Sequence, residues 1–176
     1  MKLGILFSVM NLYGQSSSDG VTLNIRLKPV QTIIVNTSQK NTELQYLTKE
    51  DYNKGVLVTL SDHLAVTSTG GFQVDVVSMD ANFTRSGSND VIPVSDVVVS
   101  AQNGSENGLS HNFSNVALSI NPESLISSES GGRNLKYNVT YDNTAGSSDK
   151  YINLNVGEDK LDVLYKADII YTITSK

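Results

Sequence analysis

The 176-residue chain has no cysteine. This absence excludes a disulfide framework, a thiolate metal site, a cysteine nucleophile and a lipid anchor on cysteine. It does not exclude export, because secreted β proteins manage without disulfides when their core is large enough. Charged residues are also scarce, at 18% of the chain, whereas serine, threonine, asparagine and glycine are abundant. The prominence of valine, isoleucine, threonine and tyrosine favours β-sheet.

The charge balance is mildly acidic, with a formal net charge of −5. Little in such a chain neutralises phosphates, so we expect no nucleic-acid partner. No amphipathic helix of crossover length appears, which excludes a parallel α/β fold. The length predicts one domain with a substantial core.

Residues 1–15 have the pattern of a signal peptide. Lys2 supplies the positive start, residues 3–13 form an apolar run too short to span a bilayer, and Gly14 and Gln15 offer a small-residue exit. We expect cleavage near Gly14–Gln15 and a secreted protein, extracellular or on the cell surface after transit through the periplasm. No membrane span is expected after the leader is removed. The alternative is that this run is the first buried strand of a cytosolic protein.

The stretch that follows, residues 21–35 (VTLNIRLKPVQTIIV), is predicted to be one long strand with a proline in its middle. Val21, Leu23, Ile25 and Leu27 alternate with polar residues, as on an amphipathic strand. Pro29 lacks a backbone N–H and therefore belongs at a bend or a sheet edge.

The rest of the chain consists of short alternating runs separated by turn residues, which predicts an all-β, Ig-like antiparallel β-sandwich. The predicted organisation is a leader over 1–15, an extension strand over 16–29 and a single sandwich domain over 30–176. A hairpin is expected over 63–78 with its turn at 69–71, and helical turns within 48–54 and 122–130. Further strands are expected over residues 30–35, 43–47, 56–60, 91–100, 113–120, 135–141, 151–156, 161–165 and 167–174.

Catalytic and metal-binding patterns are missing from the sequence. His63 and His111 have no partner at ligand spacing, so we interpret both as exposed histidines near loops and expect no metal site. The paired carboxylates at 50–51 and 158–159, with Asp162, fall in or beside turns and are interpreted as solvated charge. Asp75 and Asp168 are predicted to point outward from strands. We therefore expect no enzyme and no cofactor.

Five tyrosines gather toward the carboxyl end. Tyrosines in strands usually pack across strands or in the core, and an exposed platform that stacks on sugars is the alternative. They are Tyr137, Tyr141, Tyr151, Tyr165 and Tyr171.

The last strand, within 165–174 (YKADIIYTIT), alternates apolar residues at Ile169, Tyr171 and Ile173. It is similar to the closing strand, Y-x-D-x-V-x-V-T-V, of small secreted pilin-like proteins of the spore coat protein U and chaperone–usher type. The leader and the phrase GVTLNIRLKPVQTIIV also resemble short secreted proteins of Bacteroidota. The resemblance covers both ends of the chain and its general strand pattern.

The resemblance implies a structural or adhesive surface protein, a fimbrial fibre subunit that assembles by strand donation. Val21, Leu23, Ile25 and Leu27 would form the donor strand and pair with a neighbouring copy. Self-association is then the expected partnership, and the resemblance implies a periplasmic chaperone as well. Two alternatives stay open: residues 21–35 bridge the two sheets of their own sandwich, or the protein is a monomeric module that binds a glycan or another surface ligand.

Overall fold

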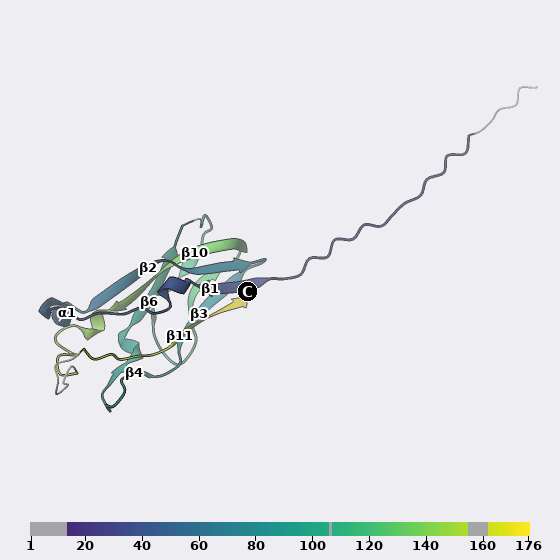
Figure 1. Cartoon of the computed structure of the whole chain (residues 1–176). Coiled ribbons are helices and arrows are strands. Elements are labelled where there is room, and N and C mark those ends of the chain that lie inside the picture. The colour runs from purple at the N-terminus through teal and green to yellow at the C-terminus, as the bar shows by residue number, and fades with distance from the viewer. Residues whose placement is uncertain (1–13, 106, 155–161) are drawn as a thin grey trace, which may run out of the picture.

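A computed structural model describes residues 14–105, 107–154 and 162–176. It confirms the all-β, Ig-like antiparallel sandwich as a single domain (Figure 1). One sheet has the strand order β1-β2-β10-β6-β8, the other has the order β11-β3-β9-β7, and β4 and β5 form a small separate ribbon. The leader predicted over 1–15 falls almost entirely outside the described residues.

The strands of the first sheet are all antiparallel to their neighbours. These strands are β1 (Gln31–Val35), β2 (Val56–Ser68), β10 (Gly132–Asn143), β6 (Val98–Asn103) and β8 (Val116–Ala117). The second sheet, also antiparallel, comprises β11 (Ile169–Ser175), β3 (Phe72–Ser78), β9 (Glu123–Ser128) and β7 (Asn112–Phe113). The ribbon pairs β4 (Asn82–Thr84) with β5 (Val91–Pro93).

The predicted hairpin over 63–78 is wrong in one important respect. Strands β2 and β3 are consecutive but belong to different sheets, so the turn at residues 69–71 crosses the sandwich. Leu64 and Val66 on β2 and Phe72 and Val74 on β3 are all buried, because each strand turns its apolar face inward from its own sheet. Neither glycine of this turn has the positive φ that tight two-residue hairpins favour.

The core lies between the two sheets and consists mainly of branched aliphatic side chains. Fully buried side chains come from both sheets, and a second set of half-buried apolar residues packs against them, several of these from β1 and β11. The largest buried apolar side chains are Tyr137, Phe72, Leu64, Leu118, Leu125, Ile126, Val66, Val74, Val76, Val99 and Val139.

The helical turn predicted within 122–130 is wrong, because residues 123–128 form strand β9. Its alternation is interrupted by a bulge opposite Val74 and Asp75, so that Leu125 and Ile126 are both fully buried. Two adjacent buried residues conceal the period of two by which a strand is recognised.

Several strands are shorter than predicted or lie elsewhere. The run at 91–100 is divided into β5, a short 3-10 helix (Val94–Asp96) and β6. The run at 113–120 is divided between β7 and β8, which lie in different sheets. Residues 43–47 form no strand, and neither do the described parts of 151–156 and 161–165. An isolated bridge joins Thr84 to Lys166, just after the last of these ranges.

The helical turn predicted within 48–54 is present as α1 (Lys49–Lys54). Thr48 caps it: its hydroxyl accepts from the Asp51 N–H, while the Asp51 carboxylate accepts from the Thr48 N–H. This is the reciprocal capping box. No helix in the described residues is long and apolar enough to cross a membrane.

Candidate functional site

The amino-terminal segment, residues 14–30, is extended and projects away from both sheets (Figure 1). Its four alternating apolar side chains are almost fully exposed: Val21 93%, Leu23 86%, Ile25 82% and Leu27 87%. Soluble proteins rarely expose so regular an apolar row without a partner for it.

The prediction of one strand over 21–35 is therefore wrong, since only Gln31–Val35 is strand. Gln31 pairs with Ser68, the last residue of β2, and beyond the bond between Thr69 and Val30 no backbone of that sheet lies opposite the residues before them. Pro29, which has no N–H to donate, stands close to the point where pairing stops. In this chain the segment does not bridge its own two sheets.

Both ends of the sandwich chain are tied to the same sheet-crossing turn. The Thr69 N–H donates to the Val30 carbonyl at 3.0 Å, and the Lys176 N–H donates to the Gly71 carbonyl at 3.1 Å. The extension therefore leaves the body beside the carboxyl-terminal end of β11, as Figure 1 shows near the label C.

Strands β1 and β11 are the neighbouring edges of the two sheets. They lie against each other but are not hydrogen-bonded to one another, so each keeps an unpaired backbone edge within the described structure. We call this place the β1/β11 seam. Ile33 and Val35 of β1 and Ile169, Tyr171 and Ile173 of β11 turn inward there and are only half-buried. An open edge lined by incompletely covered apolar residues is suited to strand addition.

The prediction for the last strand agrees with this arrangement. Ile169, Tyr171 and Ile173 share the inward face of β11, while Ile170, Thr172 and Thr174 are exposed on the other face. Strand β11 is antiparallel to β3 along its whole length. Its other edge is the one at the seam.

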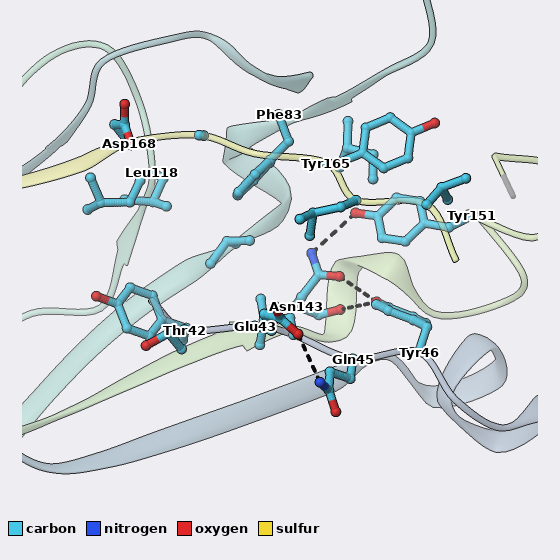
Figure 2. A pocket seen from close by; sticks show the side chains of 18 of the residues that line it. Thr42, Glu43, Gln45, Tyr46, Phe83, Leu118, Asn143, Tyr151, Tyr165 and Asp168 are labelled. Carbon is cyan, nitrogen blue, oxygen red and sulfur yellow. Dashed lines mark hydrogen bonds between the residues drawn. The ribbon is translucent and has the colours of Figure 1, made fainter. Parts of the chain in front are cut away.

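A cavity of about 770 Å³ opens at the end of the seam remote from the extension. Val35, Ile169 and Tyr171 belong to its wall, so it is continuous with the seam. Figure 2 shows tyrosine rings entering from several segments around the buried Asn143. The tyrosines in the wall are Tyr46, Tyr52, Tyr141, Tyr151, Tyr165 and Tyr171.

A chain of hydrogen bonds runs from the cavity wall to the seam. His63 Nδ1 lies 3.0 Å from the Gln39 amide oxygen, and His63 Nε2 lies 3.2 Å from the Tyr141 hydroxyl. The Tyr141 hydroxyl lies 2.6 Å from that of Tyr171, in the opposite sheet. Burial lowers the pKa of His63 and raises the pKa values of both tyrosines. All three groups are therefore neutral near pH 7, with His63 Nδ1–H donating to Gln39 and Nε2 accepting from Tyr141.

A second polar cluster stabilises the far wall of the cavity. The buried Asn143 amide accepts from the Tyr46 hydroxyl and donates to the Tyr151 hydroxyl, as Figure 2 shows, and also donates to the Asp96 carbonyl. The Asp96 carboxylate accepts from Tyr151 at 2.7 Å and from Lys150 at 2.6 Å. Burial raises the pKa of Tyr46 to about 12 and also raises that of Tyr151. These bonds satisfy one another, which indicates a structural cluster.

The structure also corrects the interpretation of the histidines. His63 is fully buried, because a bulge with positive φ at Asp62 turns the next side chain inward. A carboxylate at Asp62, in phase with the apolar Leu60 and Leu64, was the sequence signal for this bulge. His111 is half-buried, with its ring nitrogens 3.1 Å from the Asn103 amide oxygen and 3.0 Å from the Tyr137 hydroxyl.

The candidate acids do not gather at one place. Glu50 pairs with Lys54 on α1, Asp75 accepts from Gln73, and Asp168 is exposed beside the seam. Residues 158–159 lie outside the described residues. Where the structure is described, no three histidine or acidic side chains group as metal ligands would. Asp96, which is not among the predicted site residues, is the one buried acid in the described part of the chain. It stands alone among apolar residues in VIPVSDVVVS, and an isolated acid in such a run is a signal for a buried polar cluster.

Of the five tyrosines considered for core packing or sugar stacking, Tyr137 and Tyr151 are buried. Tyr141, Tyr165 and Tyr171 are half-buried and contribute to the cavity wall. They are not arranged as an exposed platform. A search with this sequence matches no protein-family model and no curated protein.

Proposed function

We propose that this protein is a secreted structural or adhesive surface protein, a pilin-like subunit that assembles when the extension of one copy enters the β1/β11 seam of another. The observation that carries the proposal is the extension itself. Four alternating apolar side chains stand more than four-fifths exposed on a segment that its own sandwich leaves unpaired.

The chemistry of donor and acceptor is complementary. A strand added to β11 would turn Val21, Leu23, Ile25 and Leu27 toward the same core that Ile169, Tyr171 and Ile173 now cover incompletely. Full burial of an aliphatic side chain is favourable by about 1.5–3 kcal/mol. New backbone hydrogen bonds would also satisfy the free edge of β11. Together these gains oppose the entropy lost when the extension is ordered.

The seam has to widen for this to happen. Strands β1 and β11 lie against each other, and an inserted strand needs a spacing of about 4.8 Å on each hydrogen-bonded side. What holds the seam closed is half-buried side chains and the Tyr141–Tyr171 hydrogen bond, without any backbone pairing between the two edges. Strand entry therefore breaks no ladder.

Donation of this kind is heterologous, because one surface of the subunit gives and a different surface receives. Repeated in one direction, it builds a fibre. Both the apolar row and the open seam would need cover before assembly, and this is the role that the resemblance gives to a periplasmic chaperone.

The test compares the chain from Ser16 onward with a chain that begins at Val30, using light scattering and electron microscopy. We expect the longer chain to form fibres and the shorter one to stay monomeric. A synthetic peptide of residues 20–28 should bind the shorter chain and raise its midpoint of unfolding. A stable monomer with the full extension, unaffected by the peptide, would contradict strand donation.

Two neighbouring substitutions give a matched control. Leu23→Asp places a charge on the apolar face of the extension and should abolish assembly. Thr22→Asp places the same charge one residue away on the polar face and should leave assembly largely intact. Both side chains lie outside the folded body, so neither variant should change the unfolding of the monomer.

The tyrosine-lined cavity favours a second candidate, a monomeric module that binds a glycan or another surface ligand. Its volume of about 770 Å³ lies within the range of small-molecule sites. Screening the Val30 chain against surface glycans tests this. A ligand whose affinity falls with Tyr165→Ala, in a chain that never assembles, would favour the binding module over the fibre subunit.

A further inference from the structure

We infer that Asp168 sets the direction and register of strand donation by receiving Lys28 of a second copy, so that the extension adds antiparallel to β11 and the assembly stays open. This inference rests on the strand donation proposed above and specifies its geometry. The partner is a second copy of this chain, identified by the order of apolar and charged residues on its extension.

The apolar side chains restrict the choice of register. Strand β11 turns Ile169, Tyr171 and Ile173 inward. In antiparallel pairing, Leu27 opposite Ile169 puts Ile25 opposite Tyr171 and Leu23 opposite Ile173. Every inward position of the acceptor then meets an apolar residue of the donor, as the alternation of a strand requires.

This register also fixes which outward-facing side chains of donor and acceptor lie opposite each other. In the same register Lys28 stands directly opposite Asp168, Arg26 stands opposite the exposed Ile170, and the neutral pairs Asn24–Thr172 and Thr22–Thr174 follow. Asp168 is exposed, and within the described residues no cation lies within ion-pair distance of its carboxylate. In Figure 2 this carboxylate lies at the edge of the cavity, on the side away from Asn143. Opposite charges directly across a strand pair are favourable.

A slip of two residues keeps a cation at Asp168 but is less favourable. Arg26 would then face Asp168 while Lys28 would face Lys166. The backbone of Lys166 is also already bonded to Thr84 of β4 in both directions. Only the register with Lys28 opposite Asp168 pairs opposite charges and also keeps the donor beside residues of β11 whose outer backbone edge is unpaired.

The reverse direction offers no comparable charge pair. Parallel addition with Val21 opposite Ile169 would carry Lys28 past Ser175 to Lys176. The Lys176 ammonium already has its own partner, the Glu129 carboxylate. No carboxylate of β11 meets Lys28 in that orientation, because Asp168 lies at the other end of the strand.

Direction decides whether the assembly closes. Antiparallel addition places the body of the donor at the cavity end of the acceptor. The acceptor's own extension leaves at the opposite end, beside Thr69, so a third copy can follow. Parallel addition would put both at the same end, where two copies could exchange extensions and form a closed dimer.

The absence of cysteine from the chain makes direction measurable by cross-linking. Thr22→Cys with Thr174→Cys tests the antiparallel register, and Thr22→Cys with Ile170→Cys tests the parallel one. The wrong pair is separated by about four residues, roughly 13 Å along a strand, which is beyond disulfide reach. On non-reducing gels we expect a ladder of covalent multimers from the first variant and little cross-linking from the second.

Charge exchange tests the role of Asp168 itself. Lys28→Glu or Asp168→Lys alone should slow assembly about 3- to 10-fold at low salt, and the double variant should restore it. Glu123→Lys, on the exposed side of β9, makes the same charge change away from the seam and serves as the control. At 1 M salt the differences should largely disappear.

The outcomes separate this inference from the proposal beneath it. Cross-links through Ile170, or a double variant that stays slow while assembly still needs residues 16–29, would overturn the register and leave strand donation standing. No cross-link in either variant, with a monomer whether or not the extension is present, would overturn strand donation itself.

Discussion

The hydroxyl oxygens of Tyr141 and Tyr171 lie 2.6 Å apart. Tyr141 belongs to β10 and Tyr171 to β11, so this hydrogen bond joins the two sheets in the interior behind the β1/β11 seam. His63, whose imidazole meets the Tyr141 hydroxyl, extends the connection to Gln39. A chain of hydrogen bonds therefore lies behind the apolar side chains of the seam. Its contribution to the free energy of unfolding can be measured.

Removal of either hydroxyl should destabilise the sandwich by different amounts. Tyr171→Phe should lower the free energy of unfolding by about 1 kcal/mol, the usual net value of one hydrogen bond. Tyr141→Phe should lower it by about 1–3 kcal/mol, because His63 Nε2 and the Tyr171 hydroxyl both lose a partner. Urea unfolding followed by circular dichroism measures both. Additive effects in the double variant would contradict a direct coupling of the two residues.

Stability should depend on pH through His63. Burial lowers its pKa from the ordinary value of 6.5, so below that pH the unfolded chain takes up a proton that the folded chain refuses. The free energy of unfolding should therefore fall as the pH drops from about 7 to 5. His63→Gln keeps hydrogen-bonding capacity without titrating and should flatten the profile. His111, whose pKa burial also lowers, should leave a smaller residual slope. An unchanged profile in the variant would assign the slope to other groups.

Asp96 should matter more for stability than any other acid described. Its carboxylate accepts from Lys150 and Tyr151 in a buried site. Asp96→Asn should lower the free energy of unfolding by about 1–3 kcal/mol, because the charge-assisted bonds weaken and a new amide donor must find a partner. Glu50→Gln, on the exposed ion pair of α1, is the control and should change stability by less than about 0.5 kcal/mol.

Two glycines with nearly the same φ should respond differently to alanine. Gly55 (φ 77°) ends α1, and a Cβ there would lie 2.6 Å from the Asn143 carbonyl oxygen. Gly87 (φ 78°) has open space around it. Gly87→Ala should cost about 1 kcal/mol for conformation alone. Gly55→Ala should cost clearly more, because backbone must also move. Equal decreases in the midpoint of thermal unfolding for the two variants would contradict a steric cost of the close contact at Gly55.

Local patterns predicted what depends on neighbouring residues. The alternation at Leu135, Tyr137 and Val139 placed β10 correctly, and that at Ile169, Tyr171 and Ile173 did the same for β11. The capping residues Thr48 and Asp51 located α1 for a similar reason, since a capping box needs only its own turn.

The failures arose where distant segments decide. At 69–71 a turn between two alternating strands was interpreted as a hairpin, yet whether the chain returns to the same sheet depends on which strands are already paired there. The bulge at Asp62 that buries His63, and the one that buries both Leu125 and Ile126, form against neighbouring strands.

The sequence by itself determined an all-β chain with an amphipathic segment at residues 21–27, because alternation and β-branched composition are local properties. Only the tertiary structure decided that this segment stays unpaired while β1 and β11 form a seam beside it. The physical reason is the register of β1 with β2: the strand pairing ends at Gln31 and Ser68, one further backbone hydrogen bond joins Val30 to Thr69, and the chain before Val30 has no backbone of its own sheet to bond with.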